Sequence, residues 1–290
     1  ALRPRIYQAI EDAAALAAHD AYYEFTLNDA HAEYIVDTIA WLKGTLRLRR
    51  LSELSIRDFA SQEDLPEGLV SILREYERAR NQDIGLYEFQ SPQDYVYDCL
   101  STLAECDYIE LPGFDLIVAD EWHDINAAHL QLLQRLHARG GQLMAAGDAD
   151  QVIHMRHGAH PDFMGPAFFA AFETTRRSPM PLSRSFRCGP TLALAAGNLA
   201  GKTFESWRTE DNGISVLLQA QLYHDQPNGL AHHLQSLQHA HQDLQPHHCA
   251  ILLRSADLSI DIENELIRQD IPYRIEGCKS YFERDEILIL

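Results

Sequence analysis

Acidic and amide side chains in two short clusters are the residues of this chain best suited to chemistry. Each cluster directly follows an apolar run, and the members are Asp120 and Glu121 in the first and Asp148, Asp150 and Gln151 in the second. One carboxylate of such a set can hold Mg²⁺, directly or through its water, while the next polarises a water that attacks a phosphate. A glutamine can orient that water or sense the terminal phosphate. The clusters therefore suit Mg²⁺–nucleotide chemistry, although a single strand that ends in Asp-Glu can also simply turn into solvent.

The apolar runs before the two clusters must position them. Residues 114–119 and 143–146 are continuously apolar rather than alternating, which predicts strands buried on both faces of a parallel sheet covered by helices. Residues 126–139, between the runs, have helical spacing and are followed by Gly140-Gly141, as helix C-termini usually are. Ligands of such sheets lie beyond the carboxyl ends of the strands, where both clusters fall. Two strand ends of this kind, with a helix between them, favour a site over two unrelated turns.

Sequence boxes around the clusters resemble those of a known family. DEWHDIN (120–126) and GDADQVIHMRHGA (147–159) resemble the DExxQD and GDxDQxIYxWRGA boxes of UvrD/Rep-like superfamily 1 DNA helicases. Residues 182–199 resemble that family's "NYRS" segment, and residues 250–287 resemble a later segment that contains IPYxIxGG and ends in FFExxEI. The resemblance is dense from about residue 114 to residue 287 and thin before that.

The resemblance implies an α/β fold of RecA-like P-loop NTPase motor domains, each a parallel sheet with flanking helices, plus an N-terminal helical insertion domain. Residues 1–110 have helical spacing, with helix starts expected at Ser55 and Pro66, and would form the 1B-like domain. By themselves they support only a plain helical bundle. Residues 111–181 would be the later half of the first RecA-like domain (1A), and residues 182–290 the first half of the second (2A). The strand–helix alternation from residue 114 onward independently predicts α/β layers.

The resemblance also implies roles in nucleotide binding and hydrolysis. Asp120 would be the carboxylate on the Mg²⁺ side, Glu121 the general base for the attacking water, and Gln151 the sensor of the γ-phosphate. Arg187 would supply charge to the γ-phosphate from the second motor domain, a task suited to a guanidinium that is always charged. Phe186 would stack on the base of ATP.

Several residues depart from the family pattern. The Gln of DExxQD is His123 here, and the Tyr, Trp and Arg of GDxDQxIYxWRGA are His154, Arg156 and His157. Aromatic side chains contribute roughly 1–3 kcal/mol for each single-stranded base that stacks on them. Because His and Arg planes stack less favourably, we expect His154 and Arg156 to contact DNA but to bind it more weakly. The family segment that residues 250–287 resemble begins with VLxRTN, and Arg254 matches its arginine. Arg254 is a weaker candidate for a DNA or interdomain contact.

A P-loop motor also needs a glycine-rich turn that cradles phosphates and a lysine that reaches them. Residues 196–203, AGNLAGKT, nearly match this pattern, with Ala in the first Gly position. The residues before Gly201 have helical character, so we predict that Gly201 is a helix C-cap. We therefore expect the chain to lack the loop and, by itself, not to hydrolyse ATP. The family's C-terminal motifs are also missing, and the end in the apolar run 287–290 predicts a piece of a longer protein.

Composition sets further limits. The 290 residues are enough for two compact domains, and a net charge of −19 argues against a simple nucleic-acid-binding protein, although a local basic groove remains compatible with it. Five scattered cysteines without CxxC spacing predict reduced thiols in the cytoplasm and no zinc site. No segment is apolar enough for a membrane span. The histidines of residues 224–248 lack metal-site spacing, so the only metal expected is Mg²⁺ bound with ATP.

Two hypotheses follow. In the first, the chain is part of an ATP-dependent 3′–5′ single-stranded-DNA translocase and helicase, which hydrolyses ATP at the cleft between two RecA-like domains. Its partners would be ATP and single-stranded or partly duplex DNA. In the second, the chain is a catalytically dead helicase-derived module that binds DNA or a protein, as the substitutions at His123, Arg156 and His157 and the acidic charge suggest. A GxxxxGK[ST] motif upstream in the complete gene would favour the first hypothesis.

Overall fold

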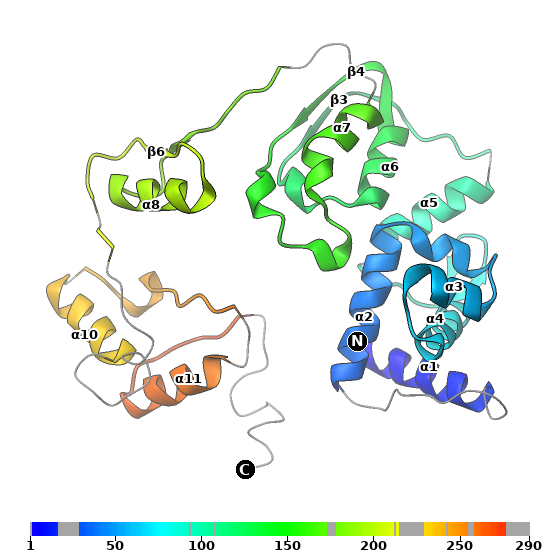
Figure 1. Ribbon diagram of the computed structural model, residues 1–290, viewed down its shortest axis with the longest axis horizontal. Coiled ribbons are helices and arrows are strands. Elements are labelled where there is room, and N and C mark those ends of the chain that lie inside the picture. The colour runs from blue at the N-terminus through cyan, green and yellow to red at the C-terminus, as the bar shows by residue number, and fades with distance from the viewer. Residues whose placement is uncertain are drawn as a thin grey trace. The chain divides into compact units, whose positions relative to one another are not determined.

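The chain divides into two compact units, Ala1–Met180 and Pro181–Leu290 (Figure 1). The computed structural model describes residues 2–16, 29–92, 94–106, 108–172, 178–211, 213–214, 229–241, 243–254 and 258–276. Unit 1 begins with helices and continues into a two-stranded parallel sheet. The described residues of unit 2 contain three α-helices, the 3₁₀ helix η6 (Pro246–His248) and a pair of very short strands. The described chain is therefore α/β, with small parallel sheets and helices.

Helices dominate the first part of unit 1, as the sequence predicts. They are α1 (Arg3–Leu16), α2 (Asp29–Gly44), α3 (Ile56–Glu63), α4 (Glu67–Arg80) and α5 (Tyr95–Glu105), with the 3₁₀ helix η1 (Arg47–Leu51) and the hairpin of β1 (Asn81–Asp83) and β2 (Leu86–Tyr87). The predicted start at Ser55 is confirmed, because its hydroxyl accepts a hydrogen bond from the amide of Asp58 at 3.1 Å. Pro66 likewise precedes α4 directly. The apolar faces of these helices form one core, in which Ile35, Phe59 and Ile72 are fully buried.

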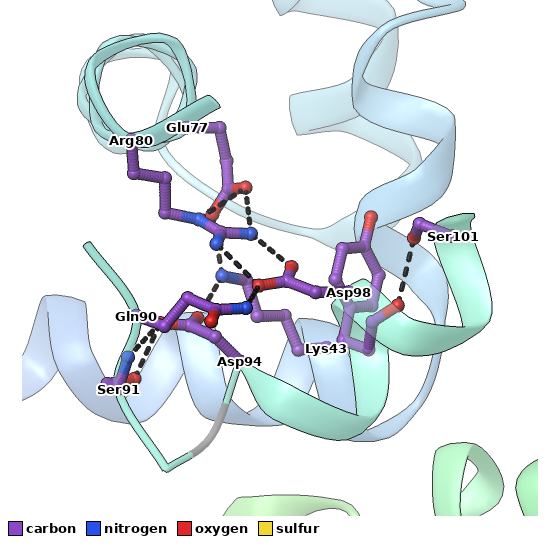
Figure 2. A network of polar contacts seen from close by, with 9 residues as sticks. Lys43, Glu77, Arg80, Gln90, Ser91, Asp94, Asp98 and Ser101 are labelled. Carbon is purple, nitrogen blue, oxygen red and sulfur yellow. Dashed lines mark hydrogen bonds and ion pairs between the residues drawn. The ribbon is translucent and has the colours of Figure 1, made fainter. Parts of the chain in front are cut away.

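A network of charged side chains lies inside the helical part of unit 1 (Figure 2). Lys43, at the end of α2, contacts the carboxylate of Asp94, and its Nζ lies 2.7 Å from Oε1 of Glu77. Arg80 donates two hydrogen bonds to the carboxylate oxygens of Asp98, at 2.8 and 2.6 Å. The side chains of Lys43 and Asp94 are completely buried. Buried charges are tolerated only when they are paired, and here each cation meets a carboxylate, so the network ties α2, α4 and α5 together.

The second part of unit 1 is built around two strands, β3 (Phe114–Ala119) and β4 (His137–Ala145), which pair in parallel. The helix α6 (Ala127–Leu136) connects them. In Figure 1, α6 and α7 (Pro166–Ala171) lie against one face of this sheet. The predicted end of the intervening helix at Gly140-Gly141 is wrong, because β4 already begins at His137. Gly140 has φ +84° inside the strand, and a Cβ on Gly141 would lie 2.9 Å from the carbonyl oxygen of Phe114. The two glycines therefore allow an irregular strand to approach β3 closely, where the pairing register shifts.

Burial of both sheet faces, as predicted from the apolar runs, is not found. Ile117 and Ala119 are half-buried, whereas Leu116 and Val118 on the opposite face are 60% and 66% exposed. The prediction is wrong for the described residues because this sheet has two strands, and helices cover one of its faces.

Unit 2 confirms the predicted helices better than the predicted strands. Its helices are α8 (Pro190–Ala200), α10 (Leu230–Ala240) and α11 (Ser259–Arg268), and its described strands β5 (Arg184–Ser185) and β6 (Glu205–Ser206) are parallel. Contrary to the prediction, residues 250–254 and 271–276 form no strand in the part of unit 2 that the structure describes. A further predicted strand, residues 214–220, lies almost wholly outside the described residues.

Candidate functional site

The two acidic clusters meet at one edge of the sheet in unit 1. Because β3 and β4 are parallel, their carboxyl ends share an edge. Just beyond that edge, the amide of Ala146 donates to the carbonyl of Ala119 at 2.9 Å, and the amide of Trp122 donates to the carbonyl of Ala146 at 2.8 Å. Residues 120–121 and 147–148 are therefore neighbours, which is the arrangement expected from the two strand ends.

Glu121 occupies an unusual backbone conformation in the turn after β3. Its φ of 49° and ψ of 43° are left-handed, which costs a non-glycine residue on the order of 1–3 kcal/mol. The amide of Glu121 donates to Oδ1 of Asp120 at 2.9 Å. On its other side Trp122 is buried, donates its Nε1–H to the carbonyl of Phe163 at 2.7 Å and packs edge-on against Phe168. The turn is thus held between the strand and an anchored indole, while the Asp120 and Glu121 side chains stay exposed.

His123 lies between the two clusters and is only 8% exposed. Its Nδ1 accepts a hydrogen bond from the amide of Asp148 at 3.3 Å. Its Nε2 lies 3.4 Å from Oε2 of Glu121 and 3.8 Å from Oδ1 of Asp124. The residue that departs from the family's glutamine therefore connects both acidic clusters directly.

Asp148 organises the second cluster. It is the N-cap of the 3₁₀ helix η3 (Ala149–Gln151), in which its Oδ1 accepts from the amide of Asp150 at 3.1 Å. Its Oδ2 accepts from Nε2 of Gln151 at 3.0 Å. The sequence placed Asp148 in the second cluster, directly after an apolar run, but assigned it no role of its own. Asp148 holds the side chain of Gln151 in one position.

The residues expected to contact nucleic acid in unit 1 lie on the 3₁₀ helix η4 (Met155–His157) and just before it. The rings of His154 and His157 stack with an interplanar angle of 5° and centroids 5.8 Å apart. The guanidinium of Arg156 lies 3.3 Å from Oδ2 of Asp37 in α2, and its side chain is 84% exposed. These planes are accessible, but Arg156 already has a carboxylate partner and the two imidazoles already stack on each other.

Glycines join this loop to the helical part of unit 1. A Cβ on Gly44, the last residue of α2, would lie 2.2 Å from the carbonyl oxygen of His157. Gly158 has φ +87° and approaches the side chain of Thr45. Asn126, the N-cap of α6, donates its side-chain amide to the same His157 carbonyl at 2.9 Å. Sequence reasoning missed this joint, because Gly44 and Asn126 each look like ordinary helix ends.

The remaining nucleotide-site candidates belong to unit 2. Phe186 follows β5, is 62% exposed, and its ring centroid lies 5.5 Å from that of the exposed Trp207. The side chain of Arg208 donates to the carbonyl of Phe186 at 2.9 Å. Arg187 is exposed, and its amide donates to the hydroxyl of Ser185 at 3.1 Å. Trp207 was not predicted, since no sequence box contains it.

Two further residues singled out in the sequence, Gly201 and Arg254, also lie in unit 2. Gly201 ends α8 with φ +66°, and the amide of Lys202 donates to the carbonyl of Gly197 at 3.0 Å. This is a helix C-cap, as predicted, and not a phosphate loop. Arg254 is exposed in a segment without described secondary structure.

The donor set at the sheet edge fits Mg²⁺ only together with phosphate oxygens. Mg²⁺ prefers hard oxygen ligands and is commonly held by one or two carboxylates plus a nucleotide. Asp120 supplies such an exposed carboxylate at the strand end. Within the described residues, no group of three or more His, Cys, Asp or Glu side chains is placed to hold a metal ion. The described helices also include none that is long and apolar enough to cross a membrane.

Comparison with known proteins places the site in a family context. A family model of the UvrD/REP helicase N-terminal domain matches residues 11–167, just over half of the chain. This range contains both acidic clusters, His123 and the η4 loop.

Curated relatives share the same region. The chain is 30% identical over 182 residues to DNA helicase II of Haemophilus influenzae, a match that covers 60% of this chain and 24% of the relative. It is 26% identical over 185 residues to the ATP-dependent DNA helicase PcrA of Leuconostoc citreum, with the same coverage. Against the ATP-dependent DNA helicase UvrD1 of Mycobacterium bovis it is 25% identical over 238 residues, 78% of this chain and 30% of the relative. The matched region is therefore between about a quarter and a third of each relative's length.

Proposed function

Because the chain belongs to the UvrD/Rep helicase family, we propose that the whole protein is an ATP-dependent DNA helicase that moves 3′ to 5′ along single-stranded DNA. The observation that carries this proposal is the meeting of the two acidic clusters at the carboxyl edge of a parallel sheet. Relatives that match this region are named as DNA helicases, two of those compared above as ATP-dependent. The partners would be ATP and single-stranded or partly duplex DNA.

The proposed roles at the sheet edge follow from exposure and contacts. Asp120 would hold Mg²⁺ with the phosphates of ATP, and the ion would neutralise charge that develops on them. Glu121, whose side chain is exposed just after the strand end, would take the proton of the attacking water. Gln151, held by Asp148, would sense the γ-phosphate. In unit 2, Phe186 would stack on the base and Arg187 would supply charge to the γ-phosphate.

The proposed architecture is RecA-like in residues 111–181 and 182–290, with residues 1–110 as a 1B-like helical domain. The strand–helix–strand unit of β3, α6 and β4 supports the first assignment. The division of the chain after Met180 supports a boundary near residue 181. We propose further that this chain alone does not turn over ATP, because its Gly-Lys-Thr sequence ends a helix.

The test is ATP hydrolysis with Mg²⁺ and single-stranded DNA, measured for the whole protein and for this chain. In the whole protein, Glu121→Gln should lower kcat by about 10²–10⁴-fold, the usual contribution of a general base. Lys202→Ala is the matched control and should leave turnover unchanged. Normal turnover of the whole protein after Glu121→Gln would refute the assignment of Glu121 as the general base. Turnover by the chain alone that Lys202→Ala abolishes would refute the helix-end interpretation.

A second candidate is a catalytically dead module that binds DNA or a protein. The ion pair of Arg156 with Asp37 and the mutual stacking of His154 and His157 favour its protein-binding form, since they occupy groups that would otherwise face nucleic acid. This alternative predicts that the whole protein binds its partner without hydrolysing ATP under any tested condition.

A further inference from the structure

One imidazole in the described part of unit 1 touches both acidic clusters. His123 belongs to the 3₁₀ helix η2 (Trp122–Asp124) and is almost completely buried, whereas the side chain of Glu121 beside it is 70% exposed. Its Nδ1 meets the amide of Asp148 at 3.3 Å and its Nε2 lies 3.4 Å from Oε2 of Glu121. The two ring nitrogens therefore face two different groups.

These two contacts determine where the proton of the neutral ring must be. A backbone N–H can only donate, so the Nδ1 that faces the amide of Asp148 must carry a lone pair. The proton of neutral His123 is then on Nε2, which faces the carboxylate of Glu121. At 3.4 Å the two atoms are farther apart than in an ordinary hydrogen bond, and a small movement of the exposed Glu121 side chain would let its carboxylate accept this proton in a charge-assisted bond. Asp124, whose Oδ1 is 3.8 Å away, is the more distant competitor for it.

We propose that His123, in its Nε2–H form, is a positioning residue that links the carboxylate of Glu121 to the backbone of Asp148. The inference rests on the proposed function, in which Glu121 is the general base. The link continues beyond Asp148, because Oδ2 of that residue holds the side chain of Gln151 at 3.0 Å. A displacement of the residue that senses the γ-phosphate is thereby passed to the residue that activates water.

Substitutions at position 123 can separate the two contacts. Asparagine keeps an acceptor near the Nδ1 position, glutamine keeps a donor near the Nε2 position, and phenylalanine keeps the ring but loses both. In the whole protein, His123→Phe should lower kcat for ATP by about tenfold or more with little change in KM, because a loosely held base is misplaced. His123→Gln should restore kcat to within about threefold of the original value, and His123→Asn should not. A glutamine variant as slow as the folded phenylalanine variant would overturn the proposal.

A second measurement does not depend on ATP turnover. The ¹⁵N shifts of the imidazole rings, recorded on this chain with His123 assigned by the signal that His123→Gln removes, report which nitrogen carries the proton. We expect Nδ1 unprotonated and Nε2 protonated in the neutral ring, with an Nε2 shift that changes in Glu121→Ala. The opposite tautomer, or an Nε2 signal indifferent to Glu121→Ala, would overturn the inference. Failure of the proposed function is a separate result, seen as normal turnover in Glu121→Gln.

Discussion

The helical part of unit 1 and its parallel sheet differ in how completely they bury their side chains. In the helical part even Lys43 and Arg80 are 0% and 1% exposed. In the sheet the apolar side chains of Leu116 and Val118 are 60% and 66% exposed. The helical part therefore buries even charged side chains in its core, whereas one face of the sheet adds little to the stability of the chain. The candidate chemistry lies at the edge of the less buried region.

Removal of the buried cation of Lys43 should cause the largest loss of stability. Lys43→Met would leave the buried Asp94 without the cation that contacts it, while Glu77 would keep its ion pair with Arg80, and the loss of one partner of a buried ion pair costs about 3–5 kcal/mol. Arg3→Met is the matched control, because the ion pair of Arg3 with Glu33 is largely exposed and such pairs contribute at most about 1 kcal/mol. Urea unfolding of both variants measures the difference. A loss below 1 kcal/mol for Lys43→Met would show that the network does not hold the helices together.

The contact between the end of α2 and the η4 loop, which joins the helical part of unit 1 to the sheet region, should be the next most sensitive to substitution. Gly44→Ala would put a Cβ 2.2 Å from the carbonyl oxygen of His157, and relief of such overpacking typically costs about 1–3 kcal/mol. Because the contacting atom is backbone, α2 and the η4 loop must move apart. Hydrogen exchange should then rise at Gly158 and Ala159, while the buried core around Ile72 stays protected. Unchanged exchange at the loop would mean that the joint tolerates a methyl group.

Acid should weaken the helical part through Asp94. Burial alone would raise the pKa of Asp94, but the charges of Lys43 and Arg80 outweigh burial and hold the pKa below its usual value. A depressed carboxyl pKa stabilises the fold above the unfolded value of about 3.9, and this contribution is lost as the pH falls through the folded pKa. Urea midpoints of the original chain should therefore fall below about pH 4. In Lys43→Met this fall should be smaller, because without the charge of Lys43 the pKa of Asp94 moves back towards its unfolded value, and an identical profile would contradict the assigned cause.

Local patterns in the sequence predicted most helices and the two strands that end at the acidic clusters, but not the side-chain contacts between residues far apart in the chain. The strand ends that deliver Asp120 and Asp148, and the helix end at Gly201, depend on neighbours along the chain, and they were predicted correctly. The pairing of Lys43 with Asp94 joins residues 51 positions apart, which no periodicity reveals. Gly140-Gly141 fits a helix end and a strand irregularity equally well in sequence, and only the approach of β3 decides between them.

Burial was the property that sequence predicted least well, for the same reason. A continuous apolar run indicates that a strand can be buried on both faces, but not that both covering layers are within reach. Leu116 and Val118 satisfy the pattern and remain exposed. The role of His123 could not be predicted either, because its two contacts come from residues that follow different strands, Glu121 after β3 and Asp148 after β4.

The smallest effect is expected on the exposed face of the sheet. Val118→Thr keeps the β-branched shape and should change the free energy of unfolding by no more than about 0.5 kcal/mol, as exposed positions usually do. The matched change Val70→Thr, at a position of α4 that is 0% exposed, buries a hydroxyl in the apolar core and should cost about 1–3 kcal/mol. Urea unfolding of the two variants compares the regions with one chemical change. Equal losses would mean that the sheet face is covered in solution, and the contrast between the two regions would then be wrong.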